Sequence, residues 1–327
     1  MSSSSYDVLC LGNAIVDVIC RVDDALLATE SITKGSMTLI DGARAEALYG
    51  VMTDVAVVSG GSAANTAVGV ASFGGRSAFI GKVRNDAVGD LFAGDLRRTG
   101  VHFATPAAED GPATARSYIM VTPDGQRSMN TYLGACQNLS VADVDPELVR
   151  GSAVTYLEGY LWDPADAKLA FRKAAEIAHA AGRKVAITLS DSFCVDRYRA
   201  EFLELIRSRT VDIVFANGAE LEALYETTAL ATAIDAIRRD CGLAVVTVGS
   251  DGAHVVTPDS TYHVPACPIA DLVDTTGAGD LFAAGYLFGF ATGRDHETSA
   301  RLGAIAAAEV IQHLGAHPQV PLIERIA

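Results

Sequence analysis

The second half of the chain alternates between amphipathic helices and short apolar strands, and this alternation restricts the fold more than any other feature. Segment 164–181 has apolar residues at helical spacing, and Gly182 follows as a helix end. Further patterns continue the alternation, with strands at 184–189, 211–215 and 244–248 and helices at 200–208 and from Asn217 onward. This order predicts an α/β fold with a mostly parallel central sheet covered by helices on both faces.

The first half differs, because after a buried strand at 8–11 its strands are shorter and half-exposed. They lie at 15–20, 36–40, 116–121 and 128–133, with helices near 63–72 and 87–98 between them. The turn Pro123-Asp124-Gly125 joins the last two strands as a hairpin. We therefore expect a small β lid at 13–41 and 106–133, on a large domain formed by 1–12, 42–105 and 134–327. An ordinary surface flap is the alternative.

Composition excludes several classes of function. The formal net charge of −15 argues against broad nucleic-acid binding and against docking on anionic membranes. The six cysteines are scattered and show no zinc-ligand spacing. The start, Met1 and four serines, lacks the basic and apolar regions of a signal peptide, and no apolar stretch reaches the ~18 residues of a membrane span. We expect a cytoplasmic protein.

The sharpest motif is the glycine-rich turn at 274–282. Gly277-Ala278-Gly279 stands at the start of an apolar helix, where converging backbone N–H groups and the helix dipole favour phosphate oxygens. Asp280 closes the turn, and a carboxylate there can accept the proton of an attacking hydroxyl. The alternative is a tight turn with Asp280 as a helix cap.

Other phosphate-binding and hydrolase motifs do not fit. A dinucleotide-binding turn would need glycine where Phe282 stands, and a Walker A loop would need Ser or Thr where Val83 follows Gly81-Lys82. The chain has no Gly-x-Ser-x-Gly sequence, which disfavours a hydrolase.

The sequence D-T-T-G-A-G-D at 274–280, followed by an apolar helix, resembles the C-terminal signature of the ribokinase-like (PfkB) carbohydrate kinases. The resemblance implies a three-layer α/β/α domain with a β lid, and ATP and Mg²⁺ as cofactors. It implies that Asp280 is the catalytic base and that the amides of Gly277, Ala278 and Gly279 form the anion hole. It also implies a monovalent-cation site, such as one for K⁺, with Asp274 and Thr276 as ligands.

Two segments near the N-terminus resemble the substrate-binding motifs of the same family. Gly60-Gly61, with Asn65 one turn into the next helix, and Asp17 in G-N-A-I-V-D are the candidates to hold sugar hydroxyls. Without the family context, the first segment reads as a turn with a helix cap, and Asp17 as an exposed strand residue.

The resemblance implies further roles near the nucleotide. Asn217 and Glu220, in N-x-x-E, would organise Mg²⁺ through its waters, although the same pair is also a capping box. The turn from Thr247 through Gly249 to Gly252 would lie along the ATP phosphates together with Gly279, and a plain hairpin is the alternative. Arg127, at the start of a lid strand, would reach the transferred phosphoryl group.

Within the family the chain resembles adenosine kinases most, on G-N-A-I-V-D at 12–17, R-S-M-N-T-Y-L-G-A at 127–135, Y-L-E-G-Y at 156–160 and T-L-S-D-S-F at 188–193. This implies phosphorylation of the nucleoside 5'-hydroxyl. A purine also needs an apolar slot. The candidates to line it, any of which can equally be core residues, are Met37, Leu39, Tyr132, Leu133, Tyr160, Trp162 and Phe193.

Several alternatives stay open at this point. The acceptor can be guanosine, inosine, ribose or a fructose-type sugar instead of adenosine. A kinase for a phosphorylated sugar would need basic residues near the substrate, and the lid segments offer mainly Arg116 and Arg127. A catalytically silent nucleoside or sugar sensor would be expected to lack Asp280 or the glycines. Relatives exist as monomers and as homodimers paired through the lid sheets, so either state fits.

Overall fold

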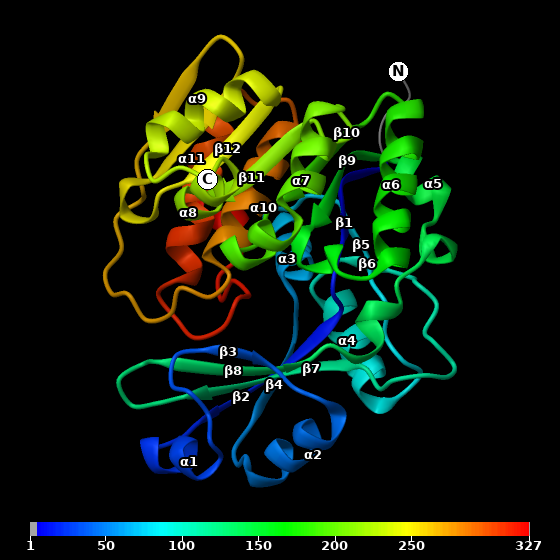
Figure 1. The fold of residues 1–327 in the computed structure, drawn as a ribbon, viewed down its shortest axis with the longest axis vertical. Helices are drawn as coiled ribbons and strands as arrows, with labels where there is room; N and C mark the ends of the chain where they lie inside the picture. Colours follow the sequence, from blue (N-terminus) through cyan, green and yellow to red (C-terminus); the bar gives the residue numbers. More distant parts are fainter. Residues whose placement is uncertain (1–4, 327) are drawn as a thin grey trace.

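Two β-sheets organise the protein, and the computed structural model describes residues 5–326 of it (Figure 1). Residues 1–4, which carry most of the N-terminal segment considered above, lie outside the described residues. The larger sheet has nine strands. In spatial order these are β14 (Thr261–Val264), β13 (Ala253–Val256), β12 (Leu243–Thr247), β11 (Ile213–Asn217), β10 (Lys184–Thr188), β9 (Ser152–Glu158), β1 (Tyr6–Leu11), β5 (Ser77–Ile80) and β6 (His102–Phe103).

The nine-stranded sheet is parallel from β12 to β6, and only the hairpin of β13 and β14 runs antiparallel to its neighbours. Helices cover both faces. One face carries α3 (Ser62–Ser72), α4 (Ala87–Arg98), α10 (Ala278–Ala291) and α11 (His296–Val310). The other carries α5 (Pro146–Arg150), α6 (Ala165–Ala180), α7 (Ser192–Arg207), α8 (Gly218–Leu224) and α9 (Leu230–Asp240). The predicted fold class is confirmed.

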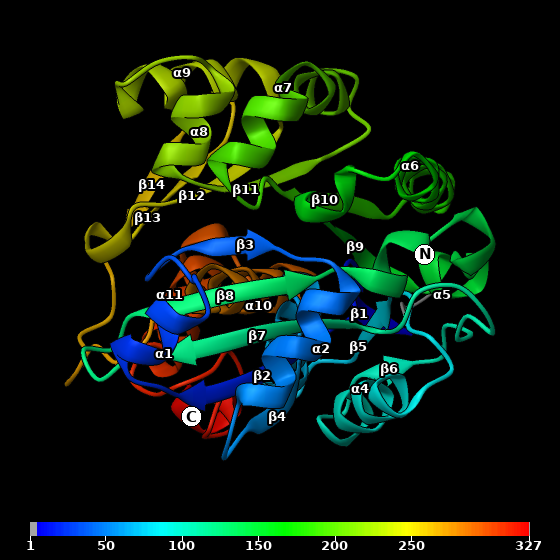
Figure 2. The ribbon, with the colours of Figure 1, turned by 60° about the horizontal axis from the view of Figure 1, so that its bottom comes forward.

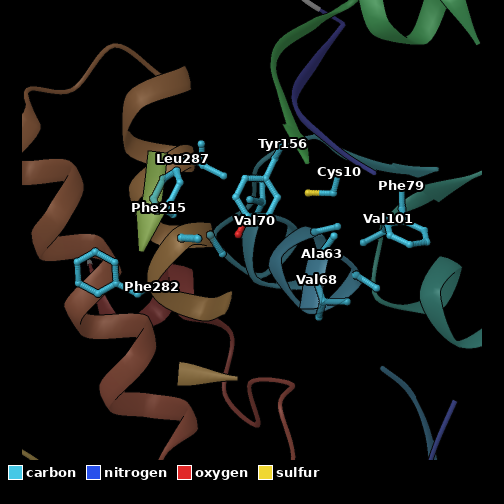
Figure 3. Packing of buried hydrophobic residues seen from close by; sticks show 14 of the residues in the cluster. Cys10, Ala63, Val68, Val70, Phe79, Val101, Tyr156, Phe215, Phe282 and Leu287 are labelled. Atoms are coloured by element: carbon cyan, nitrogen blue, oxygen red, sulfur yellow. The ribbon is translucent and has the colours of Figure 1, made fainter. Parts of the chain in front are cut away.

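The core forms because successive side chains of each central strand point to opposite faces of the sheet. In β1, Val8 and Cys10 pack with the α3 and α10 side, whereas Leu9 and Leu11 pack with the α6 side. Figure 3 shows side chains of α3 beside Cys10 and Tyr156 of the sheet. Both faces are therefore buried, which agrees with the continuous apolar runs in the sequence.

The second sheet is small and lies against one end of the large one (Figures 1 and 2). Its strands in order are β3 (Met37–Leu39), β8 (Arg127–Tyr132), β7 (Ala115–Val121), β2 (Ile15–Arg21) and β4 (Ala56–Gly60), with α1 (Asp24–Thr29) and α2 (Gly42–Val51) beside them. In β2, Val16, Val18 and Cys20 are buried, while the alternate residues are half-buried. This period of two leaves one face free to bound a cleft.

Two details differ from the expectations. The strand β4 pairs with β2 in the small sheet, although the predicted boundaries placed 42–105 in the large domain. Strand pairing between distant segments is not visible in local sequence. The helix expected at 200–208 is α7, which begins at Ser192, because Asp191 caps it by accepting a hydrogen bond from the amide of Cys194. Among the described residues, no helix is long and apolar enough to cross a bilayer.

The close packing of α10 on α11 gives a prediction about stability. A Cβ atom added to Gly285 would lie 2.5 Å from the carbonyl carbon of Leu302 on α11. We expect Gly285→Ala to lower the free energy of unfolding by ~1–3 kcal/mol, as overpacking does. Gly94→Ala in α4 is the matched control, because its Cβ would meet only a side-chain nitrogen of Arg98, at 3.9 Å. Chemical denaturation compares them, and equal stabilities would contradict the packing argument.

Candidate active site

A cleft of about 520 Å³ separates the small sheet from the large domain. The small sheet contributes residues of β2, β3, β7 and β8, including Asp17 and Thr131. The large domain contributes the start of α3, the ends of β9 to β12 and the turn before α10. The carboxyl ends of parallel strands therefore form the floor, which is where ligands bind in open α/β sheets.

Asp280 lies in the first turn of α10 and is held by the first turn of α3. The hydroxyl of Ser62 donates to its Oδ1 at 2.6 Å, and Nδ2 of Asn65 donates to its Oδ2 at 2.9 Å. Burial raises the pKa of Asp280, while these two hydrogen bonds lower it. The side-chain oxygen Oδ1 of Asn65 is buried and has no partner among the described residues, so it can accept a hydrogen bond from a ligand hydroxyl.

The glycine-rich turn presents free amides to the cleft. Gly277 caps α10 with φ of 77°, and a Cβ there would lie 2.7 Å from that of Ala316, so only glycine fits. The amide of Ala278 donates to the carbonyl of Thr275 at 3.2 Å. The amides of Gly277 and Gly279 bind no acceptor among the described residues, and a Cβ added to Gly279 would meet no atom within 4 Å. Two of the three predicted anion-hole amides are thus available.

Asp17 lies on β2 and lines the cleft. Burial raises its pKa to about 7, with Arg127 lowering it and Asp280 raising it further. No described residue donates a hydrogen bond to this carboxylate. Gly60 leaves room for it, because a Cβ at this position would lie 2.4 Å from Oδ2 of Asp17. Gly61 lines the cleft itself, next to Ser62.

Glu158, at the end of β9, is a site residue to which the sequence analysis gave no role. It is buried, and its carboxylate accepts hydrogen bonds from Nδ2 of Asn13 at 2.6 Å and from the amide of Ala63 at 2.9 Å. These contacts tie the junction of β1 and β2 to the start of α3. The available signal was an acidic residue at the end of an apolar strand. Ser62 was also missed, although it directly follows Gly60-Gly61.

Asn217 and Glu220 form the capping box of α8, as one of the two interpretations expected. Oδ1 of Asn217 accepts from the amide of Glu220 at 2.9 Å, and its Nδ2 donates to Glu220 Oε1 at 2.6 Å. Burial raises the pKa of Glu220 to about 7, helped by the nearby charges of Asp191 and Asp280. Both capping residues line the cleft.

The charges that line the cleft are unbalanced. Its carboxylates are Asp17, Glu158, Asp163, Asp191, Glu220 and Asp280, and its only lysine or arginine among the described lining residues is Arg197. A bound polyphosphate would therefore meet repulsion unless a cation accompanied it. Residues 5–326 contain no cluster of three His, Cys, Asp or Glu ligands.

Not all predicted nucleotide-binding residues reach the cleft. Thr247 lines it, whereas Gly249 and Gly252 do not. Gly252 has φ of 92°, and a Cβ there would lie 2.1 Å from the carbonyl oxygen of Val264. These glycines shape the turn between β12 and β13, which agrees with the hairpin alternative.

Arg127 and Asp274 form an ion pair that joins the small sheet to the segment before α10. The two side chains are 9% and 2% exposed. Asp274 also accepts hydrogen bonds from the amides of Thr276 at 3.0 Å and Gly315 at 3.1 Å. The carboxylate therefore already has a cation and two amide donors, so this arrangement does not fit the predicted role of Asp274 as a ligand of K⁺.

Five of the seven residues predicted to line the purine slot do line the cleft. Met37 and Leu39 come from β3, and Leu133, Tyr160 and Phe193 complete the set that reaches the cleft. Trp162 is fully buried and packs on Phe171 and Phe202 in the core. Tyr132 packs over Gly42 of α2 on the outer face of the small sheet.

A three-layer α/β fold with a small sheet over the strand ends, free amides at a helix start and a carboxylate beside them defines a small-molecule phosphotransferase. The pfkB family carbohydrate kinase pattern matches residues 7–322. The chain therefore belongs to this family, and it is an ATP-dependent kinase of sugars or nucleosides.

Two solved structures and one sequence relative are similar over most of their length. The adenosine kinase from Sinorhizobium meliloti is 55% identical, with a TM-score of 0.93 and 99% of each chain covered. A probable sugar kinase from Rhizobium etli is 51% identical, with a TM-score of 0.93 and 98% of each chain covered. The ATP-dependent ribose-1-phosphate kinase from Halopiger xanaduensis is 31% identical over 73% of this chain and 75% of its own length.

The raised pKa of Asp17 predicts a pH-dependent effect on stability. An unfolded Asp loses its proton near pH ~3.9, whereas the folded protein holds it to about pH 7. The unfolded state therefore binds fewer protons between these values, so this residue lowers stability as the pH rises through that window. We expect Asp17→Asn to raise Tm at pH 8 and to lose that gain as the pH is lowered toward 4.

Thermal unfolding across this pH range checks the prediction. Asp259→Asn is the control, because Asp259 is exposed in the turn between β13 and β14. A Tm difference for Asp17→Asn that stays constant with pH would show that the carboxylate is not perturbed by folding.

Proposed function

We propose that the protein transfers the γ-phosphoryl group of ATP to the 5'-hydroxyl of a purine nucleoside, adenosine. The observation that carries the proposal is the composition of one cleft. It combines the carboxylate of Asp280 beside free amides with an apolar wall that includes Met37, Leu39 and Phe193. A free sugar has no group that would fill such a wall, whereas a purine has. The 55% identity to an adenosine kinase supports the same acceptor.

The charges of the cleft disfavour a phosphorylated sugar as substrate. Arg197, the single basic residue among the described lining residues, is 3.0 Å from Asp163 and so already paired. A second phosphate group on the acceptor would meet the carboxylates without compensation. A neutral nucleoside does not meet this repulsion.

The proposed roles follow from the hydrogen-bonding capacity of each group. The carboxylate of Asp17 and the side-chain Oδ1 of Asn65 accept hydrogen bonds from the ribose hydroxyls. Asp280 accepts the proton of the 5'-hydroxyl. The 5'-oxygen then forms the new bond to the γ-phosphorus, while the bond from that phosphorus to the β-phosphate oxygen breaks. The amides of Gly277 and Gly279 bind the phosphoryl oxygens. Nε and Nη2 of Arg127 are buried with no partner among the described residues, and we assign them to the transferred group.

Glu220 and Asn217 are the residues we assign to Mg²⁺, through its water ligands. Bound there with ATP, the ion would neutralise phosphate charge. The excess of carboxylates around the cleft is the feature that fits a divalent cation.

An ADP-release assay with ATP and Mg²⁺ tests the function. Adenosine, guanosine, inosine, ribose and fructose 6-phosphate are compared, and we expect adenosine to give the highest kcat/KM. Asp280→Asn should lower kcat by ~10²–10⁴-fold in a protein that still folds. Near-normal turnover in this variant would contradict the assigned base, and preference for another acceptor would overturn adenosine. Binding without turnover would favour the silent sensor.

The apolar wall makes a separate prediction about specificity. Phe193 is 65% exposed on the rim of the cleft. We expect Phe193→Ala to raise KM for adenosine by about 5- to 150-fold, because base stacking on an aromatic ring contributes ~1–3 kcal/mol. Turnover of ribose, where measurable, should not change. Tyr262→Ala on β14 is the matched aromatic control away from the cleft, and an equal effect of both variants would contradict the assignment.

A further inference from the structure

Both oxygens of the Asp274 carboxylate accept hydrogen bonds from groups of the protein itself. Its Oδ1 accepts from the amide of Thr276, and its Oδ2 accepts from the amide of Gly315 and from Nη1 of Arg127. A carboxylate offers about four lone pairs, of which three are used here. The side chain is 2% exposed, so water supplies little further contact.

A backbone carbonyl next to Asp274 also accepts hydrogen bonds from the protein. The carbonyl oxygen of Ile311 accepts from the amides of Val273 at 2.9 Å and Asp274 at 3.2 Å. A monovalent cation is held in proteins by several oxygen atoms that replace its hydration shell. Of the backbone oxygens at this position, that of Ile311 is thus already occupied by two amide donors.

The balance of charge around Asp274 also argues against a bound monovalent cation. One buried carboxylate balances one positive charge, and Arg127 supplies it from a side chain that is 9% exposed. A second cation beside the guanidinium would be repelled in a site with little water. Arginine stays protonated under all conditions of interest, so this charge is permanent.

The period of two along β8 puts Arg127 on the face of the small sheet that bounds the cleft. Arg127, Met129 and Thr131 alternate along β8 on one face, and the latter two line the cleft. Arg127 uses Nη1 for Asp274 and leaves Nε and Nη2 buried without an acceptor among the described residues. Buried unsatisfied donors are unfavourable, and a bound phosphoryl group would satisfy them.

We infer that the guanidinium of Arg127 takes the place of a bound monovalent cation, with Asp274 as the residue that positions it. The inference rests on the proposed function, because it assigns the remaining donors of Arg127 to the transferred phosphoryl group. It makes both the fold around the α10 turn and the activity independent of K⁺. It also predicts that removing the guanidinium creates a K⁺ requirement where none exists.

The test measures Tm and turnover while K⁺ is exchanged for tetramethylammonium at constant ionic strength. For the unmodified protein we expect no saturable K⁺ effect on either quantity. For Arg127→Met we expect a lower Tm, because Asp274 is left buried and unpaired, and a saturable recovery of Tm by K⁺. The double variant Arg127→Met, Asp274→Asn should show no such recovery.

Arg116→Met is the matched control, because it removes an arginine from the same sheet whose partner, Glu46, is exposed. Its Tm should not respond to K⁺. Saturable stabilisation or activation of the unmodified protein by K⁺ would overturn the inference, and so would an Arg127→Met protein that folds but ignores K⁺. If that variant does not fold, the unmodified protein alone decides. The Tm readout needs no turnover, so failure of the proposed function is seen separately, as inactivity with an unchanged K⁺ response.

Discussion

The contact between the first turns of α3 and α10 is the interaction on which the site depends. Ser62 and Asn65 hold both oxygens of Asp280, although 218 and 215 residues separate them from it in sequence. The two helices can approach because residue 69 is glycine. A Cβ added at this position would lie only 2.6 Å from the Cβ of Ala284 on α10. The packing of small residues therefore fixes the direction of the carboxylate, and the same helix start supplies the free amides.

A second consequence concerns the cost of this arrangement. Asp17, Glu158 and Glu220 have pKa values raised to about 7, chiefly by burial. Clustered buried carboxylates lower stability at neutral pH, and functional sites commonly retain such groups. The extensive apolar core on both faces of the nine-stranded sheet offsets this cost. The site is thereby prepared for cations and for proton transfer before any ligand binds.

Much of this architecture could be predicted from local sequence. The alternation of strands and helices determined the fold class, and the turn at 274–280 located Asp280. What local sequence could not show was which distant segments meet. The pairing of β4 with β2, the hydrogen bonds of Glu158 to Asn13 and Ala63, and the ion pair between residues 127 and 274 all join segments far apart in the chain. Such contacts depend on tertiary packing, which the periodicity of helices and strands in the sequence does not reveal.

The central claim is that the acceptor hydroxyl meets Asp280 while a purine lies against the apolar wall. A crystal structure with adenosine, Mg²⁺ and a non-hydrolysable ATP analogue measures this directly. The account predicts a distance of ~2.6–3.2 Å between the 5'-oxygen and a carboxylate oxygen of Asp280, with the base beside Phe193. A nucleoside bound with its 5'-oxygen directed away from Asp280, or with its base outside the cleft, would contradict it.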